Sequence, residues 1–183
     1  MSSIYFFSGA CGCGKTTLSD AFAKQLVDDG KTKQVYIIHG DSFHAGFVEP
    51  EGDKNSETVS GAFLCWEEIL KFNWECIDDI ARKALGRGLD VIIDYVIEDE
   101  LPTVRKMAED FNARLYYIVL TAAEDSIRER ISRRGDTELT ERALFLKHKL
   151  DGMEENIGHL FDNTGMTVEE ELKKLNIENF AVK

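Results

Sequence analysis

The sequence predicts an α/β protein built on an open parallel sheet, and two observations carry that prediction. Short apolar runs are separated by helical patterns, and the runs cover residues 4–7, 34–39, 90–94, 114–120 and, more weakly, 159–162. The run Val91-Ile92-Ile93 is apolar at every position, as a strand covered on both faces must be. Strands that alternate with helices in this way form parallel sheets flanked by helices. We expect one domain, residues 1–183.

The first strand leads into a glycine-rich loop. Residues 9–16 read Gly-Ala-Cys-Gly-Cys-Gly-Lys-Thr and fit the pattern G-x-x-x-x-G-K-[ST]. Glycines let the backbone turn its N–H groups toward phosphate oxygens, and a helix after the loop adds its N-terminal amides and dipole. Lys15 can reach the outer phosphates, and the Thr16 hydroxyl is placed to bind Mg²⁺. Apolar residues then recur at helical spacing, at Leu18, Phe22 and Leu26.

This strand, loop and helix predict a nucleoside triphosphate site. The residues expected to hold the nucleotide are Gly9, Gly12, Cys13, Gly14, Lys15, Thr16 and Thr17. The two loop cysteines also raise the alternative of a metal or redox site, but a C-x-C pair lacks the paired C-x-x-C spacing of zinc sites. We expect a loop thiol to have a lowered pKa, because it lies near a helix N-terminus.

Composition limits the partners and the compartment. The net charge of −12 argues against nucleic acid or an anionic membrane, since both require basic surface. No run of about 18 apolar residues occurs, and no basic segment leads into an apolar one at the N-terminus. Four cysteines without an evident disulfide framework suit a reducing compartment. We therefore expect a soluble, cytoplasmic protein, either a monomer or a homodimer.

The residues that end the second and third strands are candidates for chemistry, because ligands of open α/β sheets bind at the carboxyl ends of the strands. Asp41 follows the second strand and is placed to take the proton of an attacking hydroxyl; the alternative is a helix cap. Asp94 closes the third and is expected to organise Mg²⁺ through water; the alternative is a buried strand-end cap. Tyr95 follows, where motor and AAA-type ATPases usually carry a water-activating glutamate, and no guanine-reading Asn-Lys-x-Asp motif occurs.

Arginines gather in the helical pattern at residues 123–134 and just beyond it. Arg130 and Arg134 are four residues apart and share a helix face, and Arg142 follows a turn at Gly135. Residues 130–142 are expected to form a basic, mobile lid whose arginines neutralise charge on a transferring phosphoryl group. The alternative is a solvated face whose arginines pair with Glu124, Asp125 and Glu129, above all for Arg128 and Arg133.

The region that should bind the second substrate, about residues 41–80, is acidic and aromatic. Its acidic residues are Asp41, Glu49, Glu51, Asp53, Glu57, Glu67, Glu68, Glu75, Asp78 and Asp79, against only Lys54 and Lys71. It has no arginine to clamp a phosphate; the next is Arg82. Its aromatic residues (Phe43, Phe47, Phe63, Phe72, Trp66 and Trp74) suit sugars, nucleosides or cations, although most are expected in the core.

Together these motifs resemble the small P-loop kinases, a group that includes gluconate and shikimate kinases, chloramphenicol phosphotransferase, tunicamycin-resistance proteins and zeta-toxin kinases. The motifs are the loop, Gly40-Asp41-Ser42-Phe43, Val91–Asp94, Arg130-x-x-x-Arg134 and the tail 162–167. The resemblance implies a three-layer fold with a five-stranded parallel sheet in the order 2-3-1-4-5 and a mobile lid. It also implies that Arg130 stacks on adenine, that Arg134 or Arg142 is catalytic, and that Asn163 and Thr164 contact the base.

The function expected from these features is an ATP-dependent kinase. It would use Mg²⁺ and transfer the γ-phosphoryl group of ATP to a hydroxyl of a small, non-phosphorylated acceptor, like gluconate kinases or antibiotic phosphotransferases. Asp41, Lys15 and Arg134 or Arg142 would carry catalysis, and Thr16 and Asp94 would hold the metal. Two alternatives remain open, a regulatory ATP-binding switch with slow hydrolysis and a nucleoside kinase.

Overall fold

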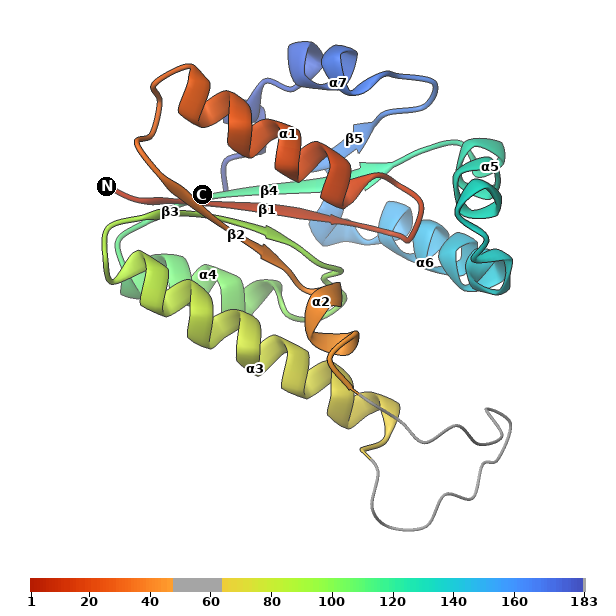
Figure 1. Ribbon diagram of the computed structural model, residues 1–183, viewed down its shortest axis with the longest axis horizontal. Coiled ribbons are helices and arrows are strands. Elements are labelled where there is room, and N and C mark those ends of the chain that lie inside the picture. The colour runs from red at the N-terminus through yellow and green to blue at the C-terminus, as the bar shows by residue number, and fades with distance from the viewer. Residues whose placement is uncertain (48–63, 183) are drawn as a thin grey trace.

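A parallel sheet forms the centre of the protein in the computed structural model, which describes residues 1–47 and 64–182 (Figure 1). Its strands are β1 (Ser3–Gly9), β2 (Val35–His39), β3 (Asp90–Asp94), β4 (Arg114–Thr121) and β5 (Leu160–Asp162). They lie in the order β2-β3-β1-β4-β5, and each pair is parallel. Both the predicted fold class and the predicted strand order are confirmed.

Helices cover both faces of this sheet. They are α1 (Lys15–Asp28), α2 (Asp41–His44), α3 (Trp66–Leu85), α4 (Leu101–Asp110), α5 (Glu124–Arg134), α6 (Thr140–Gly152) and α7 (Val168–Lys174). Figure 1 shows α1 and α7 on one face, α3 and α4 on the other, and α2 and α5 beyond the carboxyl ends of the strands. Three short 3₁₀ turns complete the described elements, at Thr137–Leu139, Glu154–Asn156 and Ile177–Phe180.

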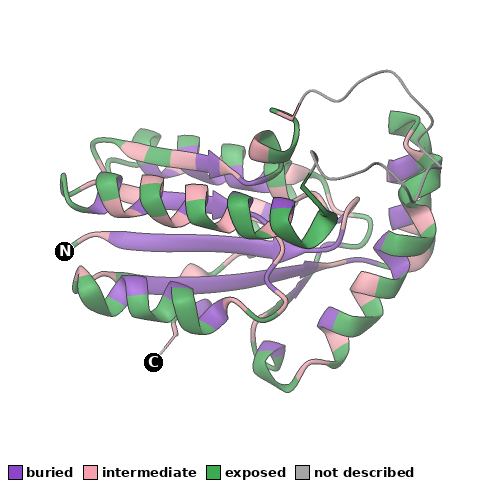
Figure 2. Ribbon diagram, turned by 90° about the horizontal axis from the view of Figure 1, so that it is seen from below, coloured by how far each residue is buried: buried purple, intermediate pink, exposed green. Residues whose placement is uncertain are grey.

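The core follows the two-residue period of the strands. In β1, Ile4 and Phe6 pack toward the layer of α3 and α4, whereas Tyr5 and Phe7 pack toward the layer of α1. Every residue of β1 is buried, and Figure 2 shows the central strands enclosed between exposed helix faces. The apolar stripe of α1 (Leu18, Phe22 and Leu26) is buried against the sheet, as its spacing predicts.

The predicted boundaries match the observed ones closely where the chain is described. The run at 90–94 is β3 itself, and the helical pattern at 58–85 appears as α3 from Trp66 onward. Several predicted features of the acceptor region lie outside the described residues, namely Glu49, Glu51, Asp53, Lys54, Glu57 and Phe63. Among the described helices, none combines the length and the apolar character that crossing a membrane requires.

Candidate nucleotide and acceptor site

The glycine-rich loop joins β1 to α1 at the carboxyl edge of the sheet. Gly12 and Gly14 have φ values of 81° and 91°, a left-handed conformation that favours glycine. A Cβ atom at Gly9 would lie 2.5 Å from the Leu120 carbonyl oxygen, so only glycine fits beside β4. The Lys15 Nζ atom lies 3.4 Å from the Ala10 carbonyl oxygen and donates to it, which places the ammonium group over the loop.

Cys13 corrects one expectation from the sequence. Its side chain is fully buried, and burial raises the pKa of the thiol rather than lowering it. The charges of Lys15 and Arg130 oppose that rise without overcoming it. The helix N-terminus therefore does not activate this thiol, because desolvation of the thiolate is the larger effect.

Thr16, Ser19 and Asp94 come together beside the loop. The Asp94 Oδ2 atom lies 3.3 Å from Ser19 Oγ, and the nearby Thr16 side chain acts to lower the pKa of this carboxylate. Asp94 is 3% exposed, and burial raises its pKa against the effects of Thr16 and His39. A carboxylate and a hydroxyl are oxygen donors of the kind that Mg²⁺ prefers, so the residues present fit a magnesium site.

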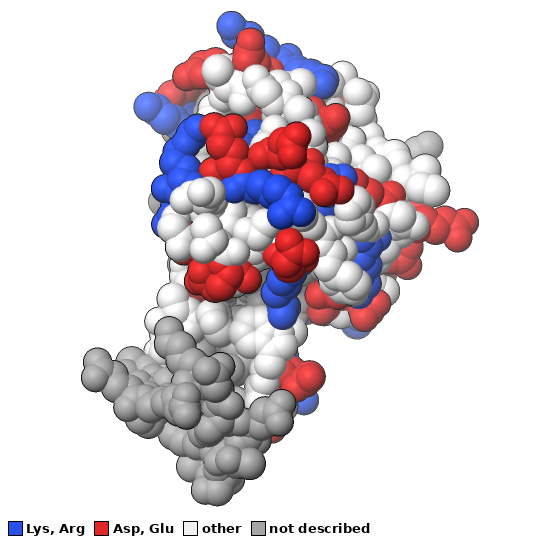
Figure 3. All heavy atoms as spheres, turned by 90° about the vertical axis from the view of Figure 1, so that its right-hand side faces the viewer, with Lys and Arg blue, Asp and Glu red and all other residues white. Residues whose placement is uncertain are grey.

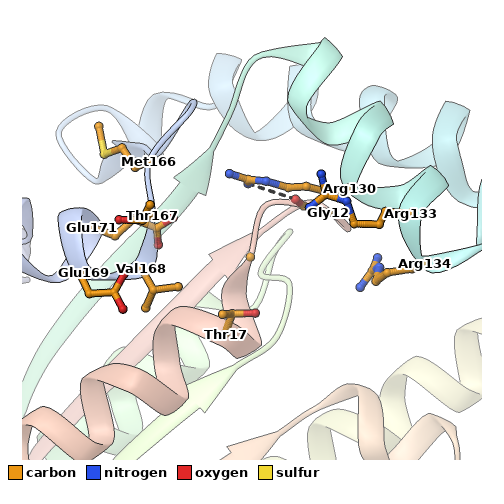
Figure 4. Close-up of a pocket in the computed structure, with 11 residues that line it drawn as sticks. Gly12, Thr17, Arg130, Arg133, Arg134, Met166, Thr167, Val168, Glu169 and Glu171 are labelled. Carbon is orange, nitrogen blue, oxygen red and sulfur yellow. Dashed lines mark hydrogen bonds between the residues drawn. The ribbon is translucent and has the colours of Figure 1, made fainter.

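A pocket of about 540 Å³ opens above the loop. The residues that line it are Gly12, Gly14, Thr17, Arg130, Arg133, Arg134, Met166, Thr167, Val168, Glu169 and Glu171. In Figure 4 the arginines of α5 lie on one side of this pocket and the residues around the start of α7 on the other, with Gly12 and Thr17 between them. The pocket thus adjoins the phosphate loop and has room for the rest of a nucleotide.

Arg130 joins the α5 wall of the pocket to the loop. Its Nη1 atom donates to the carbonyl oxygens of Gly12 and Cys13 at 3.3 and 3.4 Å, and to Asn163 Oδ1 at 3.2 Å. Glu171, from the opposite wall, is 5% exposed, and burial raises the pKa of its carboxyl group while the charge of Arg130 opposes the rise. Arg130 therefore supports the loop as well as facing the pocket.

The segment after β5 contains Asn163 and Thr164, the two residues that the resemblance places at the base. Asn163 is fully buried, and its Nδ2 atom donates to the Cys13 carbonyl oxygen at 2.9 Å. Thr164 Oγ1 accepts from the Ala123 N–H at 2.8 Å. Neither residue lines the pocket; Met166, Thr167 and Val168 do. The sequence does contain a pattern that indicates this wall of the pocket. Thr167-x-x-Glu170 is a capping box, which predicts the start of a helix, here α7.

The other arginines of α5 fall into two groups. Arg128 pairs with Glu141 at 3.3 Å, and Arg133 with Glu129 at 2.6 Å. Figure 3 shows basic and acidic side chains interleaved over this end of the molecule, as the alternative of a solvated, paired face describes. Arg134 also lies near a carboxylate, with its Nε atom 3.6 Å from Asp136 Oδ2, but its Nη2 atom contacts the loop, 3.0 Å from Cys11 Sγ.

Asp41 and Arg142 do not line the pocket; they lie on the side where the sequence predicts that the acceptor binds. Asp41 is the first residue of α2, is exposed, and has no side-chain hydrogen bond within residues 1–47 and 64–182, so no capping bond is seen. The preceding Gly40 rests on Tyr95, where a Cβ atom would lie 2.3 Å from a ring carbon. Charges from Asp41 and Arg142 reach the Tyr95 hydroxyl, whose pKa is raised chiefly by burial.

The aromatic side chains of this side divide between core and surface. Trp74 stacks on Phe6 with ring centroids 5.8 Å apart and packs against the core, as expected. Trp66 and Phe72 are 41% and 42% exposed, so these two rings are not core residues. Trp66 also contacts His44, edge to face, at 5.0 Å between ring centroids.

Comparisons with known proteins agree with this fold. A bifunctional enzyme NodQ from Rhizobium sp. (strain N33) is 26% identical over 77% of the chain, which spans only 19% of that protein. A gluconokinase from Sinorhizobium meliloti 1021 superposes with a TM-score of 0.59 at 18% identity, covering 98% of this chain and 91% of the other. The Mycobacterium tuberculosis APS kinase CysC, solved with AMPPNP and APS, gives 0.58 at 14% identity and covers 94% of each chain.

These solved structures confirm the resemblance to the small P-loop kinases at the level of fold. The family comparison names a more general group than the small P-loop kinases. A family model described as an AAA domain aligns with residues 4–160. That alignment includes the loop, both strand-end aspartates and all the arginines of α5. The protein is a member of this AAA domain family.

Proposed function

We propose that the protein is an ATP-dependent kinase that phosphorylates a hydroxyl group of a small, non-phosphorylated acceptor. One observation carries the proposal: the phosphate loop, Asp94 and Asp41 meet at one edge of the sheet, and Tyr95 follows Asp94. A description as an AAA domain fits both ATP hydrolysis and phosphoryl transfer. A buried tyrosine in place of a water-activating carboxylate favours transfer to another acceptor.

The nucleotide would lie across the loop and the pocket. The loop residues Gly9 to Gly14, with Lys15, Thr16 and Thr17, would bind the phosphates through backbone N–H groups and the ammonium group. The base would lie between Arg130 and the wall that contains Met166 to Val168. Asn163 would act indirectly, by fixing the loop through the Cys13 carbonyl oxygen, whereas Thr164 holds the backbone at Ala123.

Thr16 and Asp94 would hold Mg²⁺ at the phosphates, Thr16 through its hydroxyl and Asp94 through water. When bound, the ion would supply positive charge that offsets the negative charge of the phosphates. The protein would contribute by keeping the Asp94 carboxylate ionised although the side chain is buried. The hydrogen bond from Ser19, the nearby Thr16 side chain and the charges of Lys15 and His39 favour the ionised form.

Asp41 would act on the acceptor. As the acceptor oxygen forms its bond to the γ-phosphorus, its proton passes to the Asp41 carboxylate, and the bond from phosphorus to the bridging oxygen breaks to release ADP. The free, exposed carboxylate of Asp41 supports this role, because no hydrogen bond in the described chain occupies it. Arg134, which lines the pocket beside the loop, would stabilise the charge on the transferring group.

The charges near the acceptor side disfavour a phosphorylated acceptor. The nearest arginine along the chain, Arg82, is engaged by Asp78 at 2.7 Å and Asp110 at 2.8 Å, so it is not available as a phosphate clamp. Aromatic rings and carboxylates suit a sugar, a nucleoside or a cation better. Arg142 is the exception to this acidic setting, and its contact with Trp66 places a positive charge at the edge of the same region.

The test is a screen of acceptors. The purified protein is incubated with Mg·ATP and sugars, sugar acids, nucleosides, aminoglycosides or APS, and ADP release is compared with the rate without acceptor. A kinase hydrolyses ATP slowly alone and releases ADP faster with its acceptor, and mass spectrometry then finds the phosphorylated product. If no acceptor accelerates ADP release but a protein partner changes its rate, the result would support a nucleotide-dependent switch instead.

A further inference from the structure

We propose that His39 is a positioning residue that fixes the orientation of the Asp94 carboxylate toward the magnesium site. This inference rests on the proposed function, because it takes Asp94 as the metal-organising residue. His39 ends β2 and Asp94 ends β3, and the two residues are direct partners in the parallel register of these strands. Residues paired in this way project on the same face of the sheet, so the strand pairing itself brings the two side chains together.

The contacts around Asp94 hold both of its oxygens. His39 Nδ1 lies 3.0 Å from Oδ1, and Ser19 Oγ lies 3.3 Å from Oδ2. An ionised carboxylate only accepts hydrogen bonds, so Nδ1 carries the hydrogen in this contact. The Ser19 hydroxyl has a single hydrogen and also lies 3.0 Å from the Thr16 carbonyl oxygen, so it shares that hydrogen between two acceptors. The bond from His39 is therefore the main restraint on rotation of the carboxylate about its Cβ–Cγ bond. Oδ2 therefore stays on the side of Ser19 and α1.

The ring of His39 also lies near a second carboxylate, on its other side. Its Nε2 atom lies 3.4 Å from Asp20 Oδ1, and Asp20 belongs to α1, the helix that follows the phosphate loop. The side chain of His39 is about one-third exposed, whereas that of Asp94 is almost fully buried. His39 thus connects the third strand to the loop helix through side chains. Loss of a group that orients a direct metal ligand typically costs about 10–100-fold in metal affinity. Because Asp94 would hold the ion through water, we expect the loss of His39 to cost less than that.

Two substitutions separate this role from simple packing. His39→Asn places an amide nitrogen near the position of Nδ1 and can still donate to Asp94, whereas His39→Gln places its nitrogen near Nε2 and cannot. His148→Gln is the matched control, because His148 is an exposed histidine of α6 paired with Glu124. Asp94→Asn reports the loss of the metal site itself. Thermal unfolding of each variant shows whether the fold is intact.

The measurement is the affinity for AMPPNP by calorimetry, with Mg²⁺ and with EDTA, together with Mn²⁺ binding by electron paramagnetic resonance in the presence of AMPPNP. We expect His39→Gln to weaken binding of the divalent ion by up to about 10-fold, the lower end of the range for partners of direct ligands, while AMPPNP binding in EDTA is unchanged. His39→Asn and His148→Gln should keep most of the wild-type metal affinity.

The outcomes distinguish the two levels of the proposal. If Asp94→Asn loses the effect of the metal and His39→Gln keeps it, the inference about His39 is wrong and the proposed function stands. If both His39 variants lose stability and metal affinity equally, His39 has only a packing role, and the inference is again overturned. If Asp94→Asn binds Mg²⁺ as the wild type does, the proposed metal site itself fails.

Discussion

The Arg142 guanidinium lies over the ring of Trp66, with its central carbon 5.0 Å from the ring centroid. Arg142 is in the first turn of α6, at the end of the expected lid, and Trp66 is the first residue of α3 in the acceptor region. The contact therefore joins the lid to the acceptor side rather than to the nucleotide pocket, which Arg142 does not line. The two candidate catalytic arginines, Arg134 and Arg142, therefore lie in different places, and we expect their substitution to have different effects.

Arg142→Ala should raise the KM for the acceptor. A cation–π contact at an exposed site contributes about 0.5–1 kcal/mol, so we expect a rise of about 2- to 5-fold with little change in the KM for ATP. Steady-state kinetics with the acceptor found in the screen measure this. Phe145→Ala, at an exposed residue of the same helix, is the control. A fall in kcat of about 10³ with an unchanged KM would instead place Arg142 on the transferring phosphoryl group.

Arg134→Ala should lower kcat. Its side chain lies at the loop and lines the pocket, and an arginine that stabilises the transferring group contributes about 10³–10⁵ in rate. Arg133→Ala is the matched control, because both arginines line the pocket and lie near a carboxylate, Glu129 for Arg133 and Asp136 for Arg134, but of the two only Arg134 contacts the loop. The variants are compared by single-turnover phosphoryl transfer at saturating ATP. Unchanged rates in both Arg134→Ala and Arg142→Ala would mean that the lid has been assigned to the wrong residues.

Glu171→Gln should stabilise the protein at neutral pH. Burial raises the pKa of Glu171 in the folded state, so the folded protein holds this proton more tightly than the unfolded chain does. The ionisation of Glu171 therefore lowers the free energy of unfolding. This effect is absent below the pKa of glutamate in the unfolded chain, about 4.3, grows as the pH rises to the pKa in the folded protein, and is constant above that. A neutral glutamine avoids it.

Thermal unfolding from pH 4 to 8 tests this prediction. The Tm of Glu171→Gln should exceed that of the wild type at pH 7, and the difference should vanish near pH 4, about the ordinary value for glutamate. Glu169→Gln, an exposed residue of the same wall, should show no such gain. A variant that is less stable at pH 7 would mean that the attraction between Glu171 and Arg130 outweighs the cost of burial.

The sheet could be predicted from the sequence because its strands are continuous apolar runs. Val91, Ile92 and Ile93 leave little choice, since only a strand covered on both faces buries three successive apolar side chains in so short a run. The glycine-rich loop could also be predicted from the sequence, because the spacing of its glycines, Lys15 and Thr16 fits one backbone conformation. The order of the strands came from the resemblance and not from the residues themselves.

Other parts of the site depend on contacts that no local pattern encodes. The pairing of His39 with Asp94 requires the register of β2 against β3, which joins residues 55 positions apart. The resemblance implies that Asn163 contacts the base, but its burial against the Cys13 carbonyl oxygen depends on how β5 packs beside β4. The loop thiol was misjudged for a similar reason, because the burial that raises its pKa is a property of the packed core.

Asp41→Asn is the sharpest test of the proposed chemistry. Asparagine keeps the size of the side chain but cannot take a proton, so phosphoryl transfer should fall by about 10²–10⁴, the usual contribution of general-base catalysis. ATP affinity should stay near the wild-type value, because Asp41 does not line the nucleotide pocket. Asp79→Asn, an exposed carboxylate of the same region on α3, controls for the change in charge.

Three measurements on Asp41→Asn separate its possible roles: Mg·ATP binding, thermal unfolding and acceptor-dependent turnover. Loss of turnover alone supports the general base. Loss of ATP affinity only when Mg²⁺ is present would make Asp41 part of the metal site and leave Asp94 as the first candidate for the base. A large fall in Tm would make Asp41 a structural residue of α2, a result that the absence of a capping bond to its carboxylate within residues 1–47 and 64–182 argues against.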